Sequence, residues 1–130
     1  IERILNMELY EFFKSVIDMD TSAVVICDLS HKIVYMNPAA AERYSKRGGT
    51  KLVGSSLLDC HGKAGNEKIK QVAEWFGKSP ENNLVYTFYN EKENKDVYMI
   101  ALRDGSGKLI GYYEKHEYRT RETMEMYKMN

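Results

Sequence analysis

The sequence has no excess of charge, no long apolar run and few cysteines, and each shortage excludes a class of protein. Lys+Arg and Asp+Glu both number 19 among 130 residues, so no strong field attracts nucleic acid or an anionic lipid surface. No apolar run approaches the ~18 residues that a membrane span needs. Two cysteines are too few for a disulfide scaffold. We therefore expect a cytoplasmic protein that contacts neither nucleic acid nor membrane.

Aromatic and sulfur-containing side chains are, in contrast, plentiful. The chain has ten tyrosines and seven methionines, and 43% of its residues are apolar. That is enough to bury one core in a chain of this length. Tyrosine and methionine make a polarisable, adaptable interior, which suits a ligand pocket, although both also fill ordinary cores.

Residues 1–19 have the period of an amphipathic helix. Its apolar stripe exceeds what the edge of a small sheet needs, and burial in a homodimer would gain about 25 cal/mol for each Å² of apolar surface. The alternative is that the helix folds back across its own sheet. We favour the homodimer, with an interface that includes Leu5, Leu9, Phe12, Phe13 and Val16.

The rest of the chain alternates between strand and helix patterns. The β-branched runs and their turns predict a hairpin from 23–28 and 33–36 and a meander from 84–89, 97–102 and 109–118. Asn37-Pro38 opens a short helix at 39–44, and a basic, flexible loop follows at 46–50. A longer helix is predicted at 67–76, with Asn66 as its N-cap and Gly77 closing it. This order predicts an α+β fold in which helices cover one face of an antiparallel sheet.

Three stretches in this order resemble the PAS domain, a sensory module. They are AVVICDLSHKIVYMNPAAAERY at 23–44, LVGSSLLD at 52–59 and VYMIALRDGSGKLIGYYEKHEY at 97–118. The resemblance covers about residues 20–118, which leaves the helix 1–19 before it and a tail, 119–130, after it. It implies a five-stranded antiparallel sheet with helices on its concave face.

The resemblance also implies a cavity between the sheet and the helix 67–76. In the family this space holds haem, flavin, small acids, acyl chains or nothing, so the fold does not name a ligand. Positions of the sheet and of that helix then become candidate ligand contacts, together with the Cys-His pair before the helix. The candidates are Tyr35, Asn37, Cys60, His61, Ile69, Val72, Phe76 and Met99.

Cys60-His61 is the one pair of adjacent reactive side chains. A chelated metal needs three or four converging ligands, and adjacent residues point in different directions, so we expect no metal site. Catalysis would need a base oriented by a third group, and we expect no enzyme. The remaining interpretation is a turn at the edge of the cavity, with Cys60 as a minor candidate for redox response.

The sequence lacks the motif by which PAS domains of the resembled family hold haem and the one by which they hold flavin. The proximal histidine of haem-binding PAS domains lies on the main helix, and 67–76 contains none, so haem held by His61 or Cys60 is an alternative that we do not favour. The Asn-Cys-Arg-Phe-Leu-Gln segment of light-sensing PAS domains is absent, so flavin is not expected. His31 and His116 are expected to be solvated.

The sequence therefore predicts a PAS-type sensory domain that binds a small ligand and relays its state through a dimer or partner surface. No kinase, cyclase or helix-turn-helix pattern follows residue 118, so we expect the effector, such as a kinase or a transcription regulator, either in trans or in a part of the protein outside these 130 residues. A haem-based redox or gas sensor and a ligand-free interaction module remain the alternatives.

Overall fold

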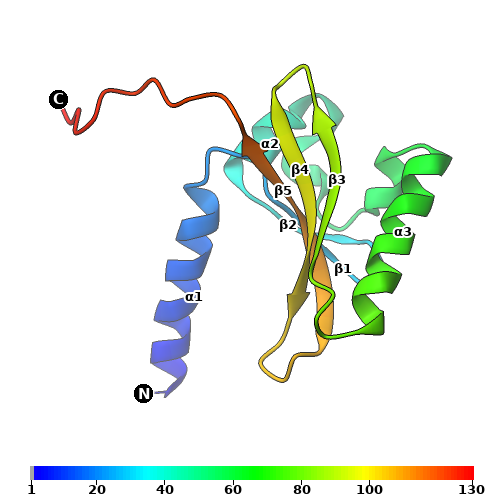
Figure 1. Cartoon of the computed structure of the whole chain (residues 1–130). Helices are drawn as coiled ribbons and strands as arrows, with labels where there is room; N and C mark the ends of the chain where they lie inside the picture. The colour runs from blue at the N-terminus through cyan, green and yellow to red at the C-terminus, as the bar shows by residue number, and fades with distance from the viewer. Residues whose placement is uncertain (1) are drawn as a thin grey trace.

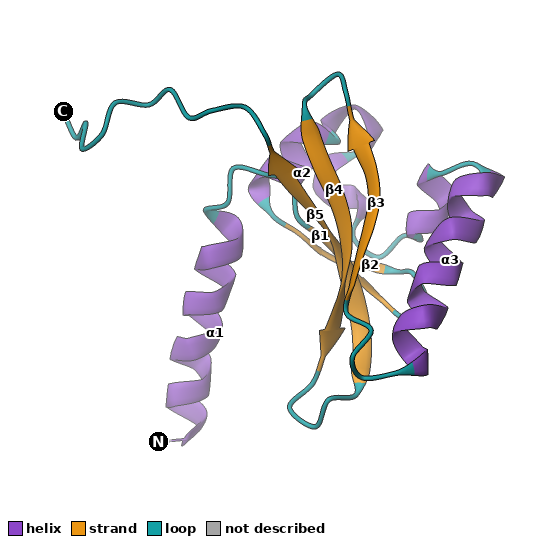
Figure 2. Ribbon diagram, in the orientation of Figure 1, coloured by secondary structure: helices purple, strands orange, loops and turns teal. Residues whose placement is uncertain are grey.

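The computed structural model describes the backbone of residues 2–130 and the side chains of residue 3 and residues 6–130. Its centre is one antiparallel sheet of five strands in the order β2-β1-β5-β4-β3 (Figure 2). The strands are β1 (Val25–Asp28), β2 (Ile33–Met36), β3 (Leu84–Asn90), β4 (Lys95–Arg103) and β5 (Leu109–Tyr118). The predicted α+β fold, with its opening hairpin and closing meander, is confirmed.

The hairpin and the helix after it are joined through one buried amide. Asn37 has no exposed surface, and its Oδ1 accepts hydrogen bonds from the N–H groups of Val24 and Ala40, each at 2.9 Å. The bond to Ala40 caps α2 (Pro38–Arg43), which begins at the proline, as expected of a residue that needs no donor there. Asn37 therefore holds the start of β1 and the start of α2 in one place.

The longer helix begins earlier and ends later than the sequence predicts. It is α3 (Lys63–Lys78), with Gly62 rather than Asn66 as its N-cap and Ser79 as its C-cap. Asn66 lies within the first turn, and its Nδ2 donates to the Leu58 carbonyl oxygen at 2.9 Å. The helix starts three residues before Asn66, whose N–H already bonds to the Gly62 carbonyl oxygen at 2.9 Å, and the prediction of Asn66 as the cap is therefore wrong.

The segment between α2 and α3 is wound into three short 3₁₀ helices, η1 (Ser45–Arg47), η2 (Gly49–Leu52) and η3 (Leu57–Cys60). The prediction of a loop at 46–50 is therefore wrong. Two glycines in the left-handed region allow the tight path, with φ of 124° at Gly48 and 55° at Gly49. Gly49 also packs closely, since a Cβ there would meet the Ala41 carbonyl oxygen at 3.2 Å.

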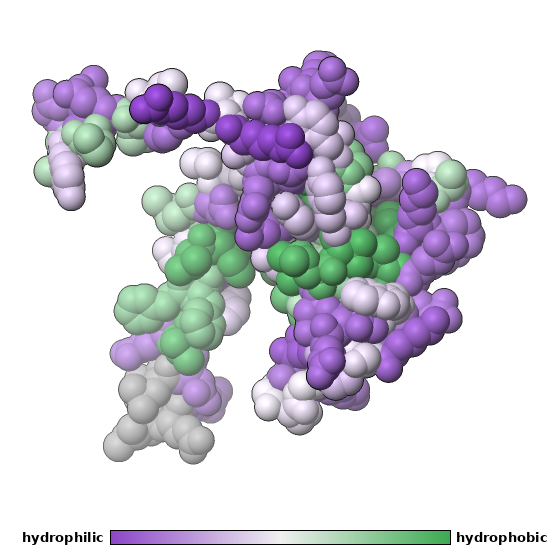
Figure 3. Space-filling view, in the orientation of Figure 1, coloured by the Kyte–Doolittle hydropathy of each residue, from purple (hydrophilic) through white to green (hydrophobic). Residues whose placement is uncertain are grey.

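The N-terminal helix, α1 (Glu2–Asp18), stands apart from the sheet, and the tail after β5 leads away from it (Figure 1). The predicted helix is confirmed, and it is not folded back across its own sheet. Hydrophobic surface gathers along it (Figure 3), and Phe12 and Val16 are 70% and 72% exposed. Leu9 and Phe13 are exposed as well, whereas the side chain of Leu5 lies outside the described residues.

Candidate ligand-binding cavity

A cavity of about 760 Å³ lies between the inner face of the sheet and the segments from α2 to α3. This size is within the range of small-molecule sites in proteins. Most of its wall is apolar and unusually rich in sulfur. The apolar lining consists of Ala23, Val25, Cys27, Ile33, Met36, Tyr44, Leu52, Leu57, Cys60, Ile69, Met99 and Tyr112.

The strands supply this wall because alternate residues face it, and an irregularity in the β1–β2 pairing, where Cys27 pairs with Ile33 and Ile26 with Tyr35, lets both Ile33 and Met36 face inward. Ile33 and Met36 of β2, Met99 of β4 and Tyr112 of β5 point inward and are almost fully buried. In β5 the alternation continues beyond Tyr112 with Glu114 and His116, which also line the cavity. The change from apolar to charged residues along one strand gives the cavity an apolar part and a polar part.

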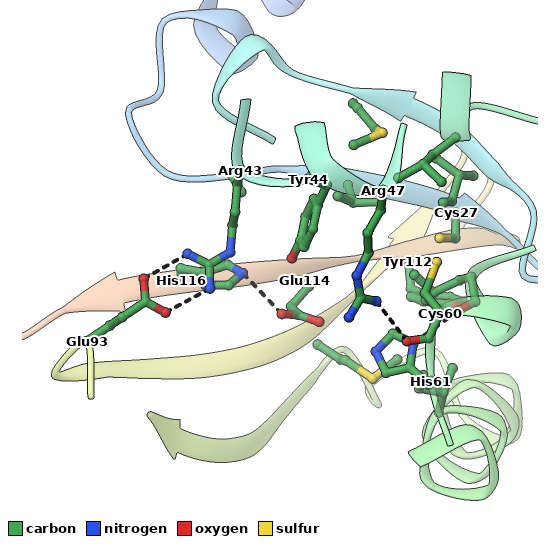
Figure 4. Close-up of a pocket in the computed structure, with 18 of the residues that line it drawn as sticks. Cys27, Arg43, Tyr44, Arg47, Cys60, His61, Glu93, Tyr112, Glu114 and His116 are labelled. Carbon is green, nitrogen blue, oxygen red and sulfur yellow. Dashed lines mark hydrogen bonds and ion pairs between the residues drawn. The ribbon is translucent and has the colours of Figure 1, made fainter. Parts of the chain in front are cut away.

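A network of charges closes the polar part. Arg43 donates two hydrogen bonds to the Glu93 carboxylate, each at 2.7 Å, and links α2 to the β3–β4 turn (Figure 4). Lys95 is only 1% exposed, and its Nζ lies 3.2 Å from Glu93 Oε2 without hydrogen-bond geometry. The Arg43 hydrogen bonds are the main reason why the pKa of Glu93 falls to about 2.

A second polar pair lies beside this network. The Nε2 of His116 is 3.1 Å from Glu114 Oε1, and only 5% of the His116 side chain is exposed. Its other nitrogen, Nδ1, is buried and has no hydrogen-bond partner among the described residues. The expectation that His116 is solvated is therefore wrong.

Cys60 and His61 lie next to Arg47, on the side of its guanidinium that faces away from Glu114 (Figure 4). Figure 4 shows Arg47 reaching down from the helical segments toward Cys60 and His61, with Glu114 on its far side. Arg47 donates to the Cys60 carbonyl oxygen at 3.2 Å. The Nδ1 of His61 lies 3.0 Å from the Leu57 carbonyl oxygen, an acceptor, so Nδ1 donates, and in the neutral form of the ring Nε2 is the acceptor. Both residues line the cavity.

A hydrogen bond behind the wall joins Tyr112 to the β1–β2 turn. The Tyr112 hydroxyl is 2.8 Å from His31 Nδ1, so the half-buried His31 is not the freely solvated side chain that the sequence predicts. Burial lowers the pKa of His31 and raises that of Tyr112. Burial also raises the pKa of Cys27 to about 12, so this thiol stays protonated at neutral pH.

The structure brings together half of the predicted ligand contacts. Cys60, His61, Ile69 and Met99 line the cavity. The other four do not: Val72 and Phe76 pack in the core beside it, Asn37 holds backbone groups, and Tyr35 donates to Asp18 at the end of α1. In β2 the inward positions are Ile33 and Met36, so Tyr35, which precedes Met36, faces the opposite side of the sheet.

The sequence analysis missed the charged residues that line the polar part, namely Arg43, Arg47, Lys92, Glu93, Glu114 and His116. Only the alternation along 109–118 carried a signal, since it places 112, 114 and 116 on one face. Within the described part of the chain, no three histidine, cysteine or acidic side chains gather as a metal site would require. No helix among the described residues is long and apolar enough to cross a membrane.

The comparisons with known proteins rest on structure. No protein-family model and no curated protein matches the sequence. A C-terminal domain from Streptococcus mutans matches with a TM-score of 0.65 and 19% identity over 84% of each chain. The PAS domain of BvgS from Bordetella pertussis matches with a TM-score of 0.60 and 15% identity over 88% of each chain.

A third match is the Aer2 receptor of Vibrio cholerae, described as a dual PAS-heme oxygen sensor. Its TM-score is 0.54 with 19% identity, over 75% of this chain and 94% of that one. At these identities the likeness concerns the fold. The strand order, the helices over the inner face and these structural matches agree with the motifs quoted from 23–44, 52–59 and 97–118: the chain has the PAS fold.

Proposed function

We propose that this chain is a cytoplasmic, non-enzymatic sensory domain that binds a small ligand in its cavity and relays its state to a second copy or to an effector protein. The observation that carries the proposal is the partly open cavity of about 760 Å³ between the sheet and the segments from α2 to α3. A well-packed interior leaves few voids larger than a water molecule. A space of this size, with polar groups converging at one part, is the usual form of a small-molecule site.

The relay would run through β2, because its two faces touch the two regions concerned. Met36 faces the cavity, and the neighbouring Tyr35 bonds to Asp18 in the last turn of α1. Asn37, the next residue, donates from Nδ2 to the Ile17 carbonyl oxygen at 2.9 Å. A ligand that shifts β2 would therefore shift the end of α1, provided that it favours one of two arrangements.

The proposal is tested by what accompanies the purified protein. Native mass spectrometry should show a mass above that of the chain, or the apo chain should gain thermal stability with a metabolite extract. The variant Ile69→Trp fills the cavity from α3 and should lose both effects while it stays folded. Gln71→Trp places the same bulk on the exposed side of α3 and should keep them.

A chain without a bound mass, whose stability no extract fraction alters, would instead favour a ligand-free interaction module. The same conclusion would follow if Ile69→Trp kept the bound mass and the gain in thermal stability as fully as Gln71→Trp. In either case the cavity would have no part in function, and the surface of α1 would remain as the candidate site of action.

Haem is a second candidate ligand because His61 has the required form. Its Nδ1 donates to Leu57, which leaves Nε2 as a free acceptor at the cavity wall, and a neutral imidazole nitrogen is the usual histidine ligand of haem iron. Haem would supply a redox- or gas-sensitive iron. Addition of hemin should then give a Soret band that His61→Ala or Cys60→Ala removes. An unchanged spectrum in both variants would eliminate this candidate.

A further inference from the structure

The polar part of the cavity carries more positive than negative charge. Four cationic side chains, Arg43, Arg47 and Lys92 on the wall and Lys95 behind Glu93, face two carboxylates, Glu93 and Glu114. Glu93 is already neutralised by Arg43 and Lys95, which leaves Glu114 as the one carboxylate facing the two further cations, Arg47 and Lys92. The uncompensated charge is therefore positive.

Arg47 is the cation with the most unused binding capacity. A guanidinium has five N–H donors, and among the described residues Arg47 makes one hydrogen bond, to the Cys60 carbonyl oxygen, and no ion pair. Figure 4 shows its guanidinium between Glu114 and the Cys60–His61 turn. Its free donors are suited to a carboxylate, which a guanidinium binds in a bidentate manner.

His116 is an independent indication that a polar group belongs here. Its Nδ1 is buried and without a partner among the described residues, although the side chain lines the cavity and is 95% buried, with 5% of its surface exposed. A buried nitrogen without a hydrogen bond is destabilising. Because Nε2 points to the Glu114 carboxylate, Nδ1 of the neutral ring is an acceptor, so a ligand that enters the polar part with a bound water or hydroxyl group would supply the missing donor.

The apolar part indicates the shape of the rest of the ligand. Met36 and Met99 extend from the sheet, and Cys27 and Cys60 add two more sulfur atoms to the same wall. Polarisable sulfur makes favourable contacts with aromatic rings. A flat, apolar body is therefore better suited to this part than a sugar or a second charged group.

From these observations, and resting on the proposed function of the cavity, we propose that its ligand is a small amphipathic anion. An aromatic or similarly flat body lies between Met36, Met99 and Ile69, and a carboxylate head binds Arg47 beside His116. The charge excess selects the anion over a neutral or cationic molecule of the same shape.

The test uses three probes with one body and different heads: 4-phenylbutyrate, 4-phenylbutanamide and 4-phenylbutylamine. Isothermal titration of the full chain near neutral pH should show that the carboxylate binds at least about tenfold more tightly than the amide. The amine should bind most weakly. Equal or tighter binding of the amide or the amine would overturn the anion inference while leaving a ligand-binding cavity intact.

Two substitutions with opposite expected signs locate the head group. Arg47→Gln should abolish the preference for the carboxylate over the amide, whereas Arg121→Gln, in the exposed tail, should retain it. Glu114→Gln removes a negative charge from the same wall and should tighten carboxylate binding several-fold. An unchanged preference in Arg47→Gln, or weaker carboxylate binding in a folded Glu114→Gln, would contradict the inference.

The cavity-filling variant separates this inference from the proposed function. Ile69→Trp should abolish binding of all three probes. Carboxylate binding that survives in Ile69→Trp would place the anion outside the cavity and overturn the inference. Failure of all probes to bind the unaltered chain would overturn it as well, whereas the proposed function would fail only if the co-purification experiment were also negative.

Discussion

The inner side of the sheet and the helix α1 contain similar residues in opposite surroundings. Met36 and Met99 at the cavity are each 6% exposed, whereas Met7 and Met19, within and just after α1, are 61% and 78% exposed. Both regions are amphipathic in sequence, so apolar periodicity alone does not say what covers a face. The inner side is covered by α3 and the short helices of the same chain, and the described residues provide no cover for α1.

Electrostatics distinguish the two regions as well. The apolar wall of the cavity ends at an ion-pair network that joins α2 to the β3–β4 turn. An ion pair in α1, Lys14 with Asp18 at 2.7 Å, joins two residues of the same helix. A concave apolar space with a charged part suits a small ligand, and an exposed apolar stripe suits another protein chain.

Asn37, which connects the sheet to α1, should be the position where a substitution costs the most stability. Asn37→Ala would leave the N–H groups of Val24 and Ala40 and the Ile17 carbonyl oxygen without their partner. We expect a loss of about 3 kcal/mol in the free energy of unfolding, measured by urea denaturation. Asn6→Ala, on the exposed surface of α1, should change it by less than about 0.5 kcal/mol. Similar losses in both variants would mean that the hydrogen bonds of Asn37 do not hold the two regions together.

Breaking the apolar stripe of α1 tests whether a second copy covers it. Phe12→Glu should weaken self-association by about 2 kcal/mol, which is roughly 30-fold in the dissociation constant, as followed by sedimentation velocity over a concentration series. Tyr10→Glu adds the same charge on another side of the helix and serves as the control. A chain that is monomeric at all concentrations, or equal effects of the two variants, would exclude the homodimer along this stripe.

Removing the carboxylate at the polar part of the cavity should have a smaller, pH-dependent effect. Glu93→Gln leaves the buried Lys95 without its counter-charge and should cost about 1–2 kcal/mol near pH 7. Since folding lowers the pKa of Glu93 from 4.5 to about 2, its stabilisation is present above pH 4.5 and is lost as the pH falls toward 2.

The unaltered chain should therefore lose stability over this window more steeply than Glu93→Gln in chemical denaturation series. Glu91→Gln, an exposed change in the same turn, should retain the steep dependence. Parallel curves for the unaltered chain and Glu93→Gln would mean that the ion pair does not stabilise the folded state.

The two thiols should differ in reactivity without a measurable effect on stability. Cys60 is partly exposed, and Cys27 is buried with a pKa of about 12. Iodoacetamide at pH 8 should therefore modify Cys60 first and Cys27 only after unfolding, as mass spectrometry of the digested protein would show. Equal rates for the two thiols would indicate that the apolar part of the cavity is open to solvent.

Much of the fold could be predicted from the sequence because the patterns that indicate it involve neighbouring residues. The alternation at 84–89 and 97–102, the Asn37-Pro38 helix start and the apolar period of 1–19 each depend on neighbouring residues. The place of Cys60 and His61 at the edge of the cavity follows from the order of these elements. The start of α3 differs from the prediction because Asn66, a residue type common at helix caps, lies inside the first turn and the helix begins at Lys63.

The polar part of the cavity could not be predicted, because it depends on contacts between distant segments. Arg43 and Glu93 are far apart in the sequence, and the charged residues around Lys95 predict an exposed turn. The register of β4 against β5 pairs Lys95 with Tyr118 and Val97 with His116. In this register the side chains of Lys95, Val97 and His116 lie on the inner face and are buried. His31 and His116 were expected in solvent for the same reason.

The most direct test of the cavity as a binding site compares the same residue type in the two regions. In a methyl NMR spectrum of methionine-labelled protein, titration with 4-phenylbutyrate should shift the Met36 and Met99 resonances and leave those of Met7 and Met19 in place. Shifts confined to Met7, Met19 or the methionines of the tail, or no shifts at all, would contradict the account.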